Sequence, residues 1–267
     1  MSVSPWSQET TDGVAPDRPR LPRSDLPPAA TVTTRRLTAI LAALAEHGDD
    51  GRGTAHLCEI AASVSGTSGA GMMLLSDELS RGSVCATDGM AASLDDAQYT
   101  LGEGPSFDAH RVGRAVLEPE LEAPAVLRWP AFSAEAVRAG ARAVFAFPVR
   151  IGAVRMGALT LHRVRSGDLE VNQYTDALVV ADVMARTILA LQAAAPPGGV
   201  ACELEQGANF HFVVHQAAGM VSVQLGISIA EALVRLRSRA FASDRPIDEV
   251  SREVVDRRLR FLASEAP

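Results

Sequence analysis

Apolar residues recur at helical spacing in some segments of the chain and alternate with polar residues in others. Helices are predicted within residues 33–47 and over 54–64, where apolar positions recur every three or four residues. Alternation of apolar and polar positions predicts four strands, at 69–75, 82–87, 142–150 and 154–163.

The two strongest strand segments indicate how the sheet is built. Ala143, Phe145 and Phe147 share one face of the first, and the short link 151–153 suits a hairpin to the second. The other patterned segments are a helix with a glycine-containing loop over 88–104 and a long helix over 171–194. This order predicts an antiparallel sheet with helices packed on it.

A proline- and glycine-rich break at residues 196–199 is the clearest boundary in the sequence, and three short helices are predicted after it. The first ends near Gly226, a capping box of Ser228 and Glu231 opens the second, and Pro246 suits the first turn of the third. About fifty residues give such a bundle a thin core, so we expect support from a partner chain or a longer first helix. The predicted apolar stripe of the second helix is Ile229, Ala232, Leu233, Leu236 and Ala240.

Charge is distributed unevenly along a chain whose formal net charge is −7. Residues 209–267 carry eight arginines against seven acidic residues, a net charge of +1, so residues 1–208 carry −8. A nucleic-acid footprint over the whole surface is therefore excluded, and any such site belongs in the C-terminal segment.

Composition also bears on the ends of the chain and on its compartment. Residues 1–30 hold six of the 15 prolines and little apolar pattern, which predicts disorder. We find no signal-peptide run and no uninterrupted apolar run approaching about 18 residues, so we expect no transmembrane helix. Cys58, Cys85 and Cys202 are widely spaced, so we expect small buried side chains without disulfides, in a reducing cytoplasm.

The three C-terminal helices carry a spaced pattern formed by residues 217–221, 228–233 and 236–240, followed by Ile247 and Val250. This pattern is similar to the ANTAR family of RNA-binding modules. Segments 101–109, 128–132 and 143–148 look like the GAF domains that precede ANTAR modules in actinobacterial regulators.

These resemblances imply an α+β protein with a GAF-like sensor domain over 33–195, containing an antiparallel sheet with helices. A linker over 196–202 and an all-α three-helix ANTAR module over 203–263 would follow. The implied function is signal-responsive transcription antitermination, in which the module stabilises paired RNA hairpins. A small-molecule ligand of unknown identity in the sensor, an upstream signalling protein or effector, and a homodimer are the implied partners.

RNA binding needs cations for phosphates and planar donors for unpaired bases, and arginine supplies both. Helical spacing places Arg235 and Arg239 on one flank of the second helix and Arg237, which matches a recurring family position, on the other. Gly219 would let RNA or another helix approach closely, while Ala218 stands where many ANTAR proteins carry a basic residue. The predicted RNA-binding set is His215, Gln216, Ala218, Gly219, Arg235, Arg237, Arg239, Arg252 and Arg258.

The sensor half offers weaker signals. Its candidate pocket residues are Asp108, His110, Arg111 and His162. The glycines at 102 and 104 lack the spacing of a phosphate loop, and the cysteines lack the arrangement of a covalent chromophore site or of GAF-type methionine sulfoxide reductases. His211 and His215 stand four residues apart without a third ligand. We therefore expect no enzyme, no resident cofactor and no metal.

Two other functions stay open at this point. Three short helices can form a DNA-binding factor, although a net charge near +1 is poor for duplex binding. Alternatively, the chain is a GAF sensor whose helical tail only dimerises and binds no nucleic acid.

Overall fold

The computed structural model describes residues 54–75, 82–122, 128–194 and 211–262, together with residues 36, 38, 40 and 42. These four early residues are helical, as predicted for 33–47. The predicted disordered segment 1–30, the break at 196–199 and Cys202 lie outside the described residues.

The described ranges contain a five-stranded sheet in the order β2-β1-β5-β4-β3, with every pairing antiparallel. All four predicted strands are confirmed. The fifth, β3, has only three residues, too few to show a period. The strands are β1 (Gly69–Leu74), β2 (Gly82–Ala86), β3 (Val116–Glu118), β4 (Ala143–Ile151) and β5 (Val154–Arg163).

Strands β4 and β5 form the predicted hairpin. Ile151 pairs with Val154, which leaves a two-residue turn whose Gly152 has a φ of 58°. Glycine suits this position because a left-handed backbone is costly for residues with a Cβ.

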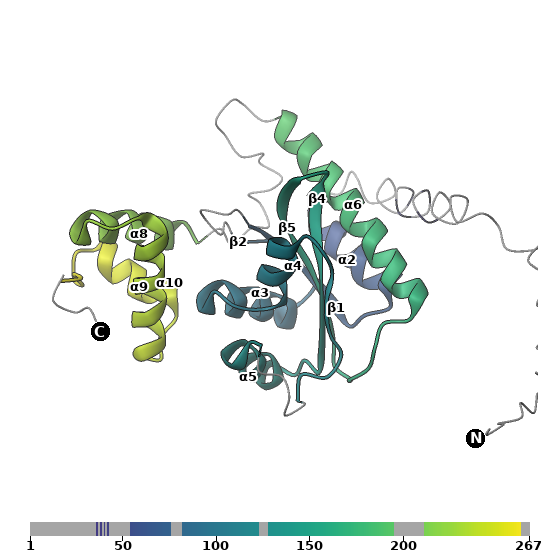
Figure 1. Cartoon of the computed structure of the whole chain (residues 1–267), viewed down its shortest axis with the longest axis horizontal. Helices are drawn as coiled ribbons and strands as arrows, with labels where there is room; N and C mark the ends of the chain where they lie inside the picture. Colours follow the sequence, from purple (N-terminus) through teal and green to yellow (C-terminus); the bar gives the residue numbers. More distant parts are fainter. Residues whose placement is uncertain are drawn as a thin grey trace, which may run out of the picture.

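Helices cover both faces of this sheet (Figure 1). One face carries α2 (Ala55–Ser65) and α6 (Val171–Ala194), and the other carries α3 (Gly89–Leu101), α4 (Pro105–Val112) and α5 (Pro130–Ala139). Strand alternation explains the division, since Phe145 and Phe147 join the core around α6 while Val144 and Ala146 join the core around α5. Periodicity missed α4 and α5, which have 8 and 10 residues.

Within the described ranges, α6 is the one unbroken helix that is long and apolar enough to cross a membrane. Its mean hydropathy is 1.6. It packs against β4 and α2 and buries Ala181, Met184 and Ala185. These contacts are those of a helix that covers a sheet.

The expectation that the cysteines stay separate is wrong for two of them. Cys58 of α2 and Cys85 of β2 form a buried disulfide, with their Cα atoms 6.1 Å apart. A separation of 27 residues forms no motif, and the pair meets only because α2 packs against β2. The bond removes the support that these cysteines gave to a reducing compartment.

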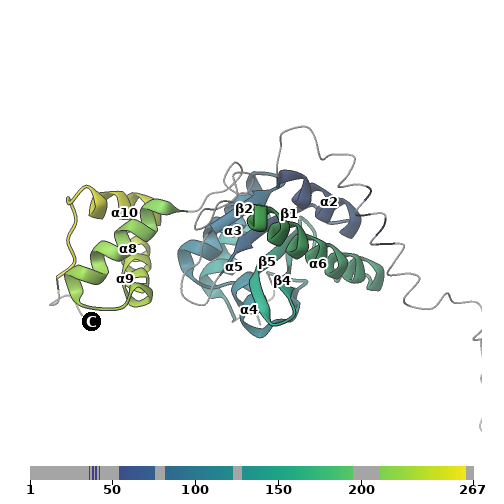
Figure 2. The same ribbon diagram turned by 90° about the horizontal axis from the view of Figure 1, so that it is seen from above.

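The C-terminal helices α8 (Phe212–Leu225), α9 (Ile229–Ala242) and α10 (Ile247–Val255) form a bundle, called here the helical module. Both views place it beside α3, on the far side from α6 (Figures 1 and 2). The capping box of Ser228 and Glu231 is confirmed, and Gly226 ends α8 with a φ of 65°. The predicted apolar stripe of α9 is wrong at Ile229, because this first residue of the helix is 45% exposed.

The core of the helical module continues into the sheet domain. One buried cluster joins Val214, Ala217 and Leu236 of the module to Tyr99 of α3 and Met73 of β1. The sheet domain of the same chain therefore supports this thin bundle, a source that the sequence did not predict.

Candidate functional site

Arg237 of α9 reaches the sheet domain. Its Nε donates a hydrogen bond to the backbone carbonyl of Tyr99, 3.0 Å away, near the C-terminal end of α3. A Cβ added to Gly102, the left-handed residue that ends α3, would lie 2.8 Å from an Arg237 Nη atom. The glycine that terminates α3 therefore also leaves room for the guanidinium.

Two aromatic rings flank the Arg237 guanidinium. Its central carbon lies 5.7 Å from the Tyr99 ring centroid and 5.9 Å from that of Phe107, both within the range of cation–π attraction. Nη2 is buried and has no hydrogen-bond partner among the described residues. Burial lowers the pKa of the guanidinium, which still remains charged at neutral pH. Arg237 is thus held but incompletely hydrogen-bonded.

His211, at the start of α8, forms the second half of this contact. Its ring stacks on Tyr99 with centroids 3.9 Å apart and planes 7° apart. Nδ1 lies 3.0 Å from Asp248 of α10, and Nε2 lies 3.4 Å from Asp96 of α3. His211 also adopts a left-handed φ of 44°, which is uncommon for a residue with a side chain.

The pKa values of the two carboxyl groups beside His211 shift in opposite directions. Burial raises the pKa of Asp96, whereas the hydrogen bond from the His211 ring lowers that of Asp248. Ligand atoms of these three residues lie within 4.8 Å of one another, close enough to hold a metal ion. Each carboxylate, however, faces a different ring nitrogen, so the arrangement is that of a histidine between two acids.

The other predicted arginines lie at the surface of the helical module. Arg239, Arg252 and Arg258 are exposed, and Arg235 is half-buried. Arg237, by contrast, lies against the sheet domain. Within the described ranges, no acidic side chain forms an ion pair with Arg235, Arg239 or Arg252.

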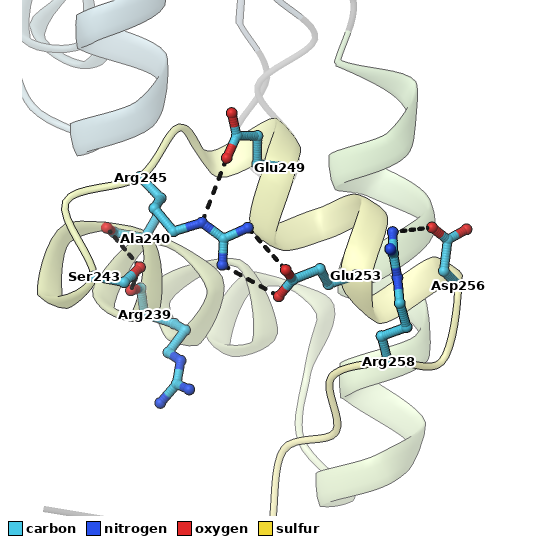
Figure 3. Close-up of polar contacts among 8 residues, drawn as sticks. All are labelled: Arg239, Ala240, Ser243, Arg245, Glu249, Glu253, Asp256 and Arg258. Atoms are coloured by element: carbon cyan, nitrogen blue, oxygen red, sulfur yellow. Dashed lines mark hydrogen bonds and ion pairs between the residues drawn. The ribbon is translucent and has the colours of Figure 1, made fainter.

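Acidic residues neutralise part of this surface (Figure 3). Arg245 pairs with Glu253 at 2.9 Å and with Glu249 at 3.4 Å, and Arg258 pairs with Asp256 at 2.5 Å. The Arg239 side chain extends away from these pairs. The surface is consequently mixed in charge, with arginines interspersed among acids rather than a uniform basic patch.

The predicted contacts around Gly219 divide by burial. Ala218 is fully buried in the module core, so its side chain offers no surface to a ligand in this conformation. Gln216 is exposed, and His215 lies edge-on to Tyr99 at 6.4 Å. A Cβ added to Gly219 would meet nothing within 4 Å. No helix of the described chain therefore uses the gap that Gly219 provides.

The candidate pocket residues of the sensor half do not converge. Asp108 accepts hydrogen bonds from Arg111 at 2.6 Å and from Arg128 at 3.0 Å, which forms a network at the surface of α4. His162 instead lies on β5, 3.9 Å from Asp88, and His110 is buried in α4. The structure therefore places the four side chains in separate surroundings.

Buried polar side chains gather between the sheet and helices α3 and α4; we call them the polar cluster. Gln98 accepts a hydrogen bond from the Ser106 backbone at 2.8 Å, and the Ser106 and Thr160 hydroxyls lie 2.6 Å apart. Asp95 accepts a hydrogen bond from Ser83 at 3.0 Å. Asp95 Oδ1 and Gln98 Nε2 are buried without a hydrogen-bond partner among the described residues. Buried polar groups normally have partners, so these two atoms require an explanation.

Asp95 is the most perturbed acid of this cluster. Burial, with a smaller contribution from Asp96, raises its pKa to about 7, against the opposing effect of hydrogen bonds from Ser83 and Thr160. Gly71 is required beside it, because a Cβ there would lie 2.6 Å from an Asp95 oxygen. The sequence signal for this cluster is the pair Asp95 and Gln98, three residues apart on α3.

A separate cavity of about 750 Å³ opens between α6, the β3 edge and the β4–β5 turn. Its lining includes Arg114, Arg128 and Arg150 beside Tyr174 and Leu178. It lies away from the polar cluster, on the side of the sheet that α6 covers.

Comparison with known proteins gives similarity in fold only. No protein-family model matches the chain, and no curated protein matches its sequence. The chain is similar to the GAF domain of a phosphoenolpyruvate-protein phosphotransferase from Coxiella burnetii, with 12% identity and a TM-score of 0.45 over 62% of this chain and 97% of that one. It is also similar to the free methionine-R-sulfoxide reductase of Neisseria meningitidis, with 15% identity and a TM-score of 0.41 over 64% and 96%.

A third similarity is to the chromophore-binding domain of Stigmatella aurantiaca phytochrome P1, with 12% identity and a TM-score of 0.40 over 63% of each chain. All three matches are distant, and function is therefore argued from the residues of this chain.

Proposed function

We propose that this chain is a signal-responsive RNA-binding regulator of the ANTAR type, which controls transcription antitermination by stabilising paired RNA hairpins. The observation that carries the proposal is the helical module itself, in which α8, α9 and α10 present Arg235, Arg239 and Arg252 without ion pairs among the described residues. Arginines that form no close ion pair keep their donors available for phosphates and unpaired bases.

The mixed charge of the module favours selective RNA contacts. Glu249, Glu253 and Asp256 lie beside Arg245 and Arg258, so the surface attracts phosphates only at the unpaired arginines. A protein that neutralises few phosphates gains little from long duplexes and more from bases held in loops. The proposed ligand is therefore a pair of hairpin loops rather than continuous duplex.

The sheet domain is proposed to be the sensor. Asp95 and Gln98 of α3 face the polar cluster, while Asp96 and Tyr99 of the same helix face the helical module. A small polar ligand at the cluster would thus act directly on the helix that contacts the module. The ligand's identity stays open, and we propose a cytoplasmic, non-enzymatic homodimer that places two modules on two hairpins.

Fluorescence anisotropy of a labelled two-hairpin RNA with the full chain tests this function. We expect Arg235→Ala together with Arg239→Ala to weaken binding and to lower the slope of log affinity against log salt by about 2, since each phosphate contact contributes roughly one. Arg186→Ala is the matched control, because Arg186 is an exposed arginine of α6 in the sheet domain.

Two results would contradict the proposal. Equal competition by duplex DNA and hairpin RNA would favour a DNA-binding factor. Dimerisation without binding of any structured RNA would favour a sensor whose helical tail only dimerises.

A further inference from the structure

Arg237, which stands at the position that the ANTAR resemblance implies for RNA binding, is held by the sheet domain. Arg237 donates to the Tyr99 carbonyl at 3.0 Å and lies between the rings of Tyr99 and Phe107. In this position Nε is bonded to the sheet domain and Nη2 is buried, so neither is available to a phosphate or a base. Full engagement of Arg237 by RNA would therefore compete with its contacts to the sheet domain.

His211, at the start of α8, contacts the same tyrosine. Its ring is 2% exposed, stacks on Tyr99 and bridges Asp96 of the sheet domain to Asp248 of α10. Tyr99 therefore contacts both His211, which stacks on its ring, and Arg237, whose central carbon lies 5.7 Å from the ring centroid. One residue of α3 thus binds two helices of the module.

The contact is also suited to release. Arg237 Nη2 is buried without a hydrogen-bond partner among the described residues, and His211 adopts a left-handed backbone. Both features cost free energy that the closed arrangement must offset and that opening would recover. An RNA phosphate would offer Arg237 the hydrogen bonds that it lacks here.

We propose that Arg237 and His211 form an autoinhibitory latch, in which Tyr99 and Asp96 of α3 hold the helical module closed and withdraw Arg237 from RNA. This inference rests on the proposed function. The latch lies on the same helix as the polar cluster, so movement of α3 would link ligand binding in the sensor to release of the module.

Asp96→Lys tests the latch in the full chain. Asp96 is 52% exposed, so the substitution leaves the core intact, and it replaces the acid facing His211 with a cation. Asp182→Lys of α6 is the matched control, with the same charge change at a site that is 49% exposed and pairs with Arg186 away from the module. Small-angle X-ray scattering reports opening, and anisotropy with the two-hairpin RNA reports affinity.

For Asp96→Lys we expect a larger radius of gyration and about tenfold tighter RNA binding, a factor typical of coupled sites. Asp182→Lys should match the wild type in radius and affinity. Adding Arg237→Ala to Asp96→Lys should abolish the gain in affinity while the chain stays open.

The outcomes separate the latch from the proposed function. An unchanged radius for Asp96→Lys would overturn the latch. Opening with unchanged affinity, or a gain that persists without Arg237, would overturn its autoinhibitory role. Opening with no RNA binding by any variant would support the closed contact and overturn the proposed function instead.

Discussion

At the scale of single residues, Asp95 links the polar cluster to pH. Its pKa is raised to about 7 in the folded chain from an ordinary value of 3.8. The folded state therefore holds a proton that the unfolded state has lost between these values, and stability falls as pH rises from about 4 to about 7. Below the lower value this loss is absent, and above the upper value it is complete.

Asp95→Asn removes this titration while keeping the side-chain shape. Relative to the wild type, we expect the variant's free energy of unfolding to rise by a few kcal/mol between pH 4 and pH 8, at about 1.4 kcal/mol per unit of pKa difference. Urea unfolding at both pH values measures it. Asp182→Asn, at an exposed acid, is the control, and a constant difference between Asp95→Asn and wild type would contradict the effect.

At the scale of elements, Gly219 lies inside α8 without a packing reason within the described chain. An interior glycine destabilises a helix by about 1 kcal/mol relative to alanine, and a Cβ here would meet nothing within 4 Å. We expect Gly219→Ala to stabilise the module by about that amount and yet to weaken RNA binding, since the methyl group would stand in the path of the ligand.

Thermal unfolding and RNA anisotropy on the same samples measure both effects. Higher stability with unchanged affinity would remove Gly219 from the RNA surface. A loss of stability would show instead that the position is crowded, contrary to the open space beside it.

Elements were predictable where burial imposes a period over many residues. The hairpin of β4 and β5, the long helix α6 and the capping box at Ser228 all follow from local rules. Helices α4 and α5 escaped because both are short and open with a proline, and their apolar faces span few turns. The disulfide escaped because only packing of α2 on β2 brings its cysteines together.

At the scale of the whole molecule, the helical period predicted the flank of α9 on which Arg237 lies, but it could not predict the residue that Arg237 contacts. Helical spacing separates Arg237 from Arg239, whereas the partner Tyr99 lies 138 residues away in the chain. Likewise, His211 and His215 suggest a pair on one helix, but the acids beside His211 come from α3 and α10. Contacts between distant segments depend on tertiary packing, which no local period records.

The buried cluster shared by the sheet domain and the helical module predicts that the two parts unfold cooperatively. Tyr99 and Met73 belong to the same cluster as Val214 and Leu236, so the thin helical module is stabilised by the sheet domain. We expect the wild type to unfold in one calorimetric transition, because loss of either part exposes the common core.

Asp96→Lys should split this transition into two, with the module unfolding first, and Asp182→Lys should keep a single transition. Two transitions already in the wild type, or one in Asp96→Lys, would show that the two parts are not coupled through the latch.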